Sequence, residues 1–247
     1  MMFGRGIKLF KLFGFEVRLD WSWLIIAGLL TWSLAEGVFP SFFPGLTPAA
    51  YWWMGAAGTV GLFVSIVLHE LGHSVVARRF GIPMRSITLF IFGGVAEMEE
   101  HPPSAKAEFF MAIAGPAVAV VLAGLFLGLT FLGRFWVWPR PVAGVLDYLG
   151  WVNVLLLAFN LVPAFPLDGG RVFRSALWAW RKNLLWATRV ASGLGSLFAV
   201  LLMGWGVFSF VTGSFVGGVW YFIIGLFILN ASRMSYRQVL RTHMSIA

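Results

Sequence analysis

Three residues that could act together in catalysis lie within the five-residue stretch HELGH, from His69 to His73. Residues four apart on a helix lie about 40° from each other around the axis, so both histidines would face one metal ion. Glu70 lies beside the first histidine and is not itself a ligand. A metallohydrolase needs two neutral imidazoles and a third ligand for zinc, and a carboxylate that accepts a proton from the attacking water. The spacing therefore predicts a site for one Zn²⁺ ion.

The stretch lies inside a strongly apolar segment, TVGLFVSIVLHELGHSVVARRF, from Thr59 to Phe80. Ionisable side chains inside a membrane-spanning segment are costly and are usually retained for function. Histidines that only form hydrogen bonds between helices are the alternative interpretation, and the cost disfavours it. We therefore expect hydrolysis at membrane depth.

The composition indicates a polytopic membrane protein, because 60% of the 247 residues are hydrophobic and 11% are charged. The absence of cysteine excludes disulfides and thiolate ligands. The formal net charge is +8. We expect no nucleic-acid binding, because the basic residues cluster at the ends of apolar segments without a base-reading motif.

Hydropathy predicts one all-α domain over residues 1–247 with six transmembrane helices. Residues 1–19 are interpreted as an interfacial basic segment with a short strand in KLFGFEVRL, because no cleavage site of a signal peptide follows them. Residues 85–96 are too short for a span and predict a small re-entrant β-hairpin or sheet. The spans are expected at about 21–38, 56–79, 105–132, 145–166, 190–211 and 216–231.

The basic residues also predict an orientation. With six spans, all 18 Lys and Arg except Arg134 and Arg140 lie on the side of the two termini. The positive-inside rule then predicts a multi-pass protein of the cell (inner) membrane with both termini in the cytoplasm. Residues 69–73 lie in the final third of their span, so the site is expected towards the cytoplasmic side.

A third metal ligand must lie at the depth of the histidines. Glu36 and Asp147 lie at the outer ends of spans, and the acidic residues 97, 99 and 100 with His101 lie in a polar loop; Glu108 and His243 are further candidates. Depth favours Asp168, in PAFPLDGG, where two prolines break the helix and two glycines let the backbone turn.

HELGH followed by NLVPAFPLDGG resembles the site-2 protease family of intramembrane zinc metalloproteases. FGGVAEM and the AGP at Ala114 to Pro116 are similar to the family's intervening segments, so the resemblance covers essentially the whole chain. It implies that His69, His73 and Asp168 bind zinc and that Glu70 is the general base. It also implies that Asn160 steadies substrate or the oxyanion, although an asparagine there could instead bond carbonyls freed by the prolines.

The chain departs from the family pattern in one place. Members often carry an asparagine shortly after the GP of span three, whereas this chain has Ala119 and no polar side chain in GPAVAVVLAG. A role of that asparagine is therefore not expected here. The layout resembles the compact six-span branch without a PDZ domain, whose members often continue into CBS domains, and we expect such a module to be absent or removed.

The expected reaction is peptide-bond hydrolysis in the transmembrane segment of a membrane-protein substrate, as in regulated intramembrane proteolysis. Residues 85–96 could pair with the extended substrate or could only shape the cavity. The expected partners are the lipid bilayer and the substrate. We hypothesise that the substrate enters laterally between spans one and six. The sequence leaves open whether the protein is a monomer or a homodimer. A non-catalytic zinc-binding receptor or transporter is the alternative function.

Overall fold

The computed structural model of the chain describes residues 7–12, 15–82, 84–90, 93–98 and 102–244. The chain divides into two compact units. The first consists of Met1–His101 and Ala114–Leu157, and the second of Pro102–Ile113 and Ala158–Ala247.

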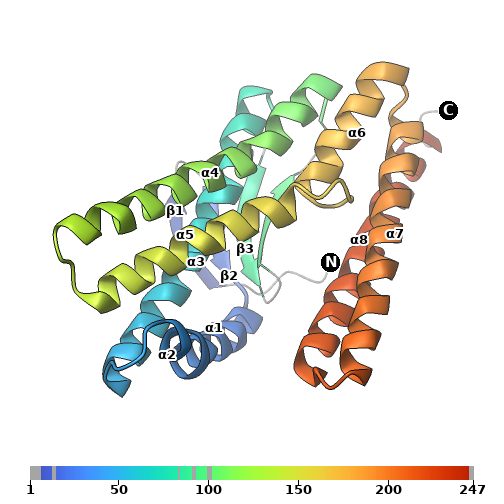
Figure 1. Ribbon diagram of the computed structural model, residues 1–247. Helices are drawn as coiled ribbons and strands as arrows, with labels where there is room; N and C mark the ends of the chain where they lie inside the picture. The colour runs from blue at the N-terminus through green and yellow to red at the C-terminus, as the bar shows by residue number, and fades with distance from the viewer. Residues whose placement is uncertain (1–6, 13–14, 83, 91–92, 99–101, 245–247) are drawn as a thin grey trace. The chain divides into compact units, whose positions relative to one another are not determined.

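The first unit combines a small sheet with helices (Figure 1). Its elements are β1 (Ile7–Leu12), β2 (Phe15–Leu19), α1 (Trp21–Ser33), the π-helix η1 (Leu34–Val38), α2 (Phe39–Phe42), α3 (Pro48–Arg79), β3 (Met84–Phe90), β4 (Gly93–Met98) and most of α4 (Ala105–Phe135) and α5 (Arg140–Asn160). The second unit contains the start of α4 and the end of α5. Its other helices are α6 (Asp168–Arg181), α7 (Leu184–Val211) and α8 (Phe215–Met244).

Six helical segments among the described residues are long and apolar enough to cross a membrane. They are Trp21–Phe42, Pro48–Arg79, Ala105–Phe135, Arg140–Asn160, Leu184–Val211 and Phe215–Arg241. The predicted fold class, six transmembrane helices with a small sheet, is confirmed. The fourth helix ends at Asn160, earlier than the expected 166, because Pro163 and Pro166 follow and proline cannot continue the helical hydrogen bonds.

Helix α3 is long and both of its ends are well defined. Thr47 caps its start, where the hydroxyl oxygen accepts a hydrogen bond from the amide of Ala50 at 3.3 Å, and Pro48 occupies the first turn. The helix ends before Gly81, whose φ of 75° favours glycine. At 32 residues it exceeds the roughly 20 that span a bilayer core. Residues 69–73 therefore lie well towards its C-terminal end.

The described strands form one sheet in the order β1-β2-β3-β4. β1 and β2 are antiparallel, β2 and β3 are parallel, with Val17 opposite Ile87, and β3 and β4 are antiparallel, with Thr88 opposite Val95. The predicted hairpin is therefore present as β3 and β4, although residues 91 and 92 lie outside the described residues. The strand expected in KLFGFEVRL joins the same sheet, which the sequence did not indicate.

The sheet packs on the part of α3 that precedes HELGH. Val17 and Leu19 of β2 form a buried cluster with Val67, two residues before His69. Trp23 adds an edge-to-face contact with Phe63, at 4.7 Å between ring centroids. The sheet therefore fixes the position of the α3 backbone close to the histidines.

In the second unit, α7 and α8 form an antiparallel hairpin (Figure 1). Small residues let their backbones approach closely: a Cβ at Gly206 would lie 2.7 Å from the carbonyl oxygen of Gly218. Ser232 of α8 donates through its hydroxyl to the carbonyls of Ser192 and Phe165, each at 3.0 Å. The second of these bonds attaches the segment before α6 to the hairpin.

Candidate metal centre

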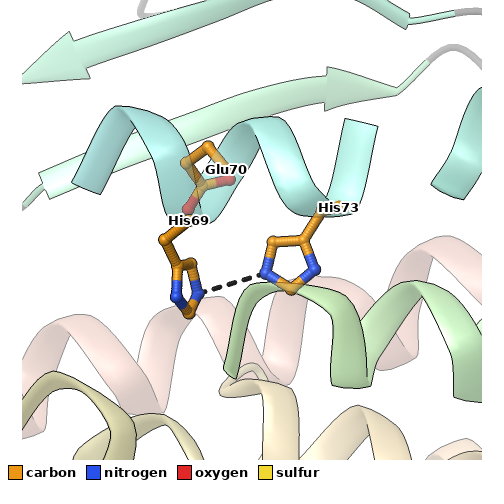
Figure 2. Close-up of side chains that lie close together, drawn as sticks. All are labelled: His69, Glu70 and His73. Atoms are coloured by element: carbon orange, nitrogen blue, oxygen red, sulfur yellow. Dashed lines mark hydrogen bonds between the residues drawn. The ribbon is translucent and has the colours of Figure 1, made fainter. Parts of the chain in front are cut away.

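His69 and His73 lie on one face of α3 with their rings turned towards each other. Both are buried, with 3% and 5% of their surface exposed. Their Nε2 atoms are 3.2 Å apart and the ring centroids are 4.8 Å apart. Figure 2 shows the two rings side by side below the helix, joined by the dashed line between these nitrogens. The predicted sharing of a helix face is therefore present in the folded chain.

Glu70 completes the group. Its side chain is half-buried and leaves α3 beside the first histidine (Figure 2). One potential ligand atom from each of the three side chains lies within 4.8 Å of the others. Among the described residues this is the only cluster of three or more histidine or acidic side chains that could hold a metal ion.

The geometry of the histidine pair fits a zinc ion. Zn–N bonds are about 2.0–2.1 Å and structural and catalytic sites are close to tetrahedral, so two nitrogens on one ion lie roughly 3.3 Å apart. The Nε2 atoms of His69 and His73 are 3.2 Å apart before any ion is considered. Two imidazoles and a carboxylate are also the donor set typical of hydrolytic zinc sites. These residues therefore suit the metal that the motif predicts.

Asp168 is the first residue of α6 and is 94% buried, with a relative exposure of 6%. The backbone around it is tightly packed: a Cβ at Gly169 would lie 2.2 Å from the carbonyl oxygen of Leu161, and one at Gly170 would lie 2.3 Å from the amide nitrogen of Phe165. Only glycine permits this close approach of α6 to the preceding loop. Because Asp168 belongs to the second unit, its position relative to the histidines stays a prediction.

Glu108 and Arg174 form an ion pair that holds α6 against the start of α4. Arg174 donates from Nε to Glu108 Oε1 at 2.7 Å, and its Nη2 donates to the same oxygen. The two side chains have relative exposures of 6% and 0%. The guanidinium also lies over the Phe165 ring, 4.6 Å from the centroid. Glu108 was an open candidate for the third ligand, and the structure instead gives it this structural partner.

The other candidate site residues from the sequence lie on several different elements. Asn160 is half-buried at the end of α5, and Glu36 is exposed in η1. Asp147 lines a pocket of about 330 Å³ together with Arg134 and Arg140. Residues 99–101 lie outside the described residues. The side chains of Glu97 and His243 are likewise outside the described part of the chain.

Asn153 is a buried polar residue near the site that sequence reasoning missed. Its amide donates to Ser65 Oγ at 3.0 Å and to the carbonyl of Leu149 at 2.8 Å. Ser65 precedes His69 by four residues and so lies on the same face of α3. The bond links α5 to the α3 turn before the metal centre. The only available signal was one amide within the apolar stretch between Asp147 and Asn160, which indicates function or an interhelical bond without saying which.

Fold and site together define a multi-pass membrane protein with a His–Glu–His group on a helix long enough to cross a membrane. The family model for peptidase family M50 matches residues 57–137 and 137–204. The chain therefore belongs to peptidase family M50, and the predicted resemblance to the site-2 protease family is confirmed.

Two curated relatives and one solved structure are similar to the chain. Rip3 of Mycobacterium tuberculosis, whose name describes a zinc metalloprotease, is 42% identical over 230 residues, which is 92% of this chain and 58% of that protein. Zinc metalloprotease MJ0392 of Methanocaldococcus jannaschii is 32% identical over 208 residues, 83% of this chain and 55% of that protein. The chain thus spans little more than half the length of either relative.

The structure of a site-2 protease from Methanocaldococcus jannaschii superposes with a TM-score of 0.62 at 27% sequence identity. The match covers 93% of this chain and 94% of that one. The similarity therefore extends over nearly all of the six-span fold.

Proposed function

We propose that the protein is an intramembrane zinc metalloprotease that hydrolyses peptide bonds in the transmembrane segments of membrane proteins. The observation that carries this proposal is the buried His69 and His73 pair, with its two Nε2 atoms 3.2 Å apart on a span-length helix. Membership of family M50 and the names of Rip3 and MJ0392 support it.

In this proposal His69, His73 and Asp168 hold one zinc ion. Zinc bound there would polarise the scissile carbonyl and lower the pKa of its bound water towards about 7. The imidazoles would hold the ion through Nε2, the two nitrogens that face each other. Asp168 contributes a carboxylate oxygen from the start of α6.

Glu70 acts as the general base. Its carboxylate lies within 4.8 Å of the imidazole nitrogens and is half-buried, so it can reach the attacking water while remaining open to solvent protons. It accepts a proton from that water on a carboxylate oxygen and then donates it to the nitrogen of the leaving amine. Asn160 is proposed to steady the substrate backbone or the developing oxyanion through its side-chain amide.

The substrate binds in an extended form, because a helix hides its carbonyl groups in its own hydrogen bonds. β4 supports this step, since it is an edge strand of the described sheet and its outer backbone groups can pair with another chain. Backbone pairing makes little demand on sequence. The substrate class is therefore defined more by an unwound membrane segment than by particular side chains.

The experiment compares cleavage of a single-span substrate in liposomes by wild type and by Glu70→Gln. We expect Glu70→Gln to retain zinc and to lose cleavage by on the order of 10²–10⁴-fold, the usual size of general-base catalysis. Glu36→Gln is the matched control, because Glu36 is an exposed acidic residue of another helix and should cleave at the wild-type rate.

Equal cleavage by wild type and Glu70→Gln would refute the assigned base. Zinc binding by a wild-type protein that cleaves nothing would instead favour the non-catalytic receptor or transporter.

A further inference from the structure

Gly115 of α4 faces the two imidazoles at very short range. A Cβ atom added to this residue would lie 2.2 Å from Nε2 of His73, 2.5 Å from Nε2 of His69 and 2.6 Å from Cε1 of His73. Optimal contacts between such atoms are about 3.5–4.0 Å, so no side chain fits beside the histidines as they are arranged. The missing side chain at 115 is therefore part of the metal centre's shape.

The two short distances also approach the length of a Zn–N bond, about 2.0–2.1 Å. A methyl group at 115 would therefore compete with a bound ion for the space next to both Nε2 atoms. The clash would fall on the side-chain nitrogens that the proposed function assigns to the metal, and all three of the nearest atoms are imidazole atoms.

The neighbouring helices leave little room to relieve such a clash. At the same crossing, a Cβ at Gly72 of α3 would lie 2.9 Å from Cγ2 of Val118 and 3.0 Å from the carbonyl oxygen of Ala114. α3 and α4 therefore approach closely at this crossing. The rings of His69 and His73 are buried. Turning either ring away from the added methyl group would also move its Nε2 atom away from the other histidine.

We infer that Gly115 is a positioning residue for metal binding: its lack of a side chain lets both Nε2 atoms face one divalent cation. This inference rests on the proposed function, because it concerns the same histidine pair. It assigns a role to a residue that is not a metal ligand and that acts through the space it leaves open beside the two imidazoles.

Helix α4 supplies matched controls. Gly124 and Gly128 lie on the same helix, and a Cβ at either would meet no atom within 4 Å. Alanine at these positions only raises the helical propensity. Gly72→Ala is a second comparison, because it strains the same helix crossing and the nearest atoms of α4 to its added Cβ belong to Val118 and Ala114.

The test measures zinc content and zinc affinity of the purified full chain in detergent, with the unfolding temperature of the metal-free proteins. We expect Gly115→Ala to bind zinc about 10–100-fold more weakly than wild type, which is the typical loss of metal affinity when the positioning of a ligand is disturbed. Gly124→Ala should bind like wild type, and Gly72→Ala should bind more tightly than Gly115→Ala. Metal-free Gly115→Ala should still fold, and its unfolding temperature should fall no further than that of metal-free Gly72→Ala, which strains the same helix crossing.

Each other outcome overturns a defined part of this inference. Equal zinc affinity of Gly115→Ala and Gly124→Ala would refute it while leaving the metal centre in place. Equal losses in Gly72→Ala and Gly115→Ala, or a metal-free Gly115→Ala protein that does not fold, would assign Gly115 to helix packing instead. A wild-type protein that binds no zinc would refute the proposed metal centre itself.

Discussion

His69 and His73 are polar side chains on a mostly apolar helix that is long enough to cross a membrane. Their arrangement depends on the spacing along α3 and on two features supplied from outside that helix. The sheet packs on Val67, and α4 presents Gly115 without a side chain. The arrangement of the histidine pair therefore depends on the folded first unit.

Asp168 provides the sharpest prediction for a single residue. Asp168→Ala should lower the zinc affinity by more than the 10–100-fold typical of losing a ligand's supporting contact, because it removes the proposed third ligand itself. Asp147→Ala is the control, since this carboxylate lines a pocket with Arg134 and Arg140 and should not affect zinc. Zinc affinity is measured by chelator competition, and equal values for the two variants would show that Asp168 is not a ligand.

Residue spacing within one helix was sufficient to predict the histidine pair, because helical geometry relates positions 69 and 73 directly. The Glu108–Arg174 ion pair could not be predicted, since the two residues are 66 positions apart and each has other charged neighbours in the sequence. The contact of Gly115 with the imidazoles was equally hidden, because a glycine carries no signal of what approaches it.

At the level of elements, α6 depends on the Glu108–Arg174 pair. Glu108→Met or Arg174→Met alone should lower the free energy of unfolding by about 3–5 kcal/mol, because each leaves a buried partner uncompensated. The double variant Glu108→Met with Arg174→Met should lose clearly less than the sum. Denaturant unfolding in detergent measures this, and strictly additive losses would mean that the two side chains do not act as a pair.

The β1–β2 hairpin gives a prediction for pH. Lys8 and then Arg18 donate hydrogen bonds to Glu16 and lower its pKa to about 2, from an ordinary 4.5. A lowered pKa means that the contribution of Glu16 to stability is complete above about pH 4.5 and is lost as pH falls from there towards 2. Because these groups are accessible to solvent, the effect should be small and should weaken with salt.

Hydrogen exchange of the β1 and β2 amides checks this expectation. Protection should decrease over that acidic range in wild type and should be independent of pH there in Glu16→Gln. The same pH dependence in both proteins would assign it to another group.

For the whole molecule, the basic residues predict which side of the membrane each loop faces. The chain contains no cysteine, so each engineered cysteine is a unique label. Val137 lies between α4 and α5 and is 88% exposed, and Met234 lies towards the end of α8 and is 67% exposed. An impermeant thiol reagent should label Val137→Cys on intact cells and Met234→Cys only after permeabilisation. The opposite pattern would invert the proposed orientation.

The fold of the whole molecule was largely predictable, because long apolar segments must form helices in a bilayer. Hydropathy predicted the six spans, and β-branched residues before Gly93 predicted β3 and β4. The parallel pairing of β2 with β3 joins residues about 70 positions apart, and no local pattern encodes it. Helix α6 was also missed, since it is short and its arginines resembled a basic loop.

Cleavage of a single-span substrate in liposomes, measured before and after zinc is removed and added back, tests the central claim most directly. The protein should lose cleavage when a chelator removes the metal, and about one equivalent of Zn²⁺ should restore the initial rate, as expected for one catalytic zinc site. Cleavage at the full rate by metal-free protein would contradict the account, because it would leave His69, His73 and Asp168 without their proposed role.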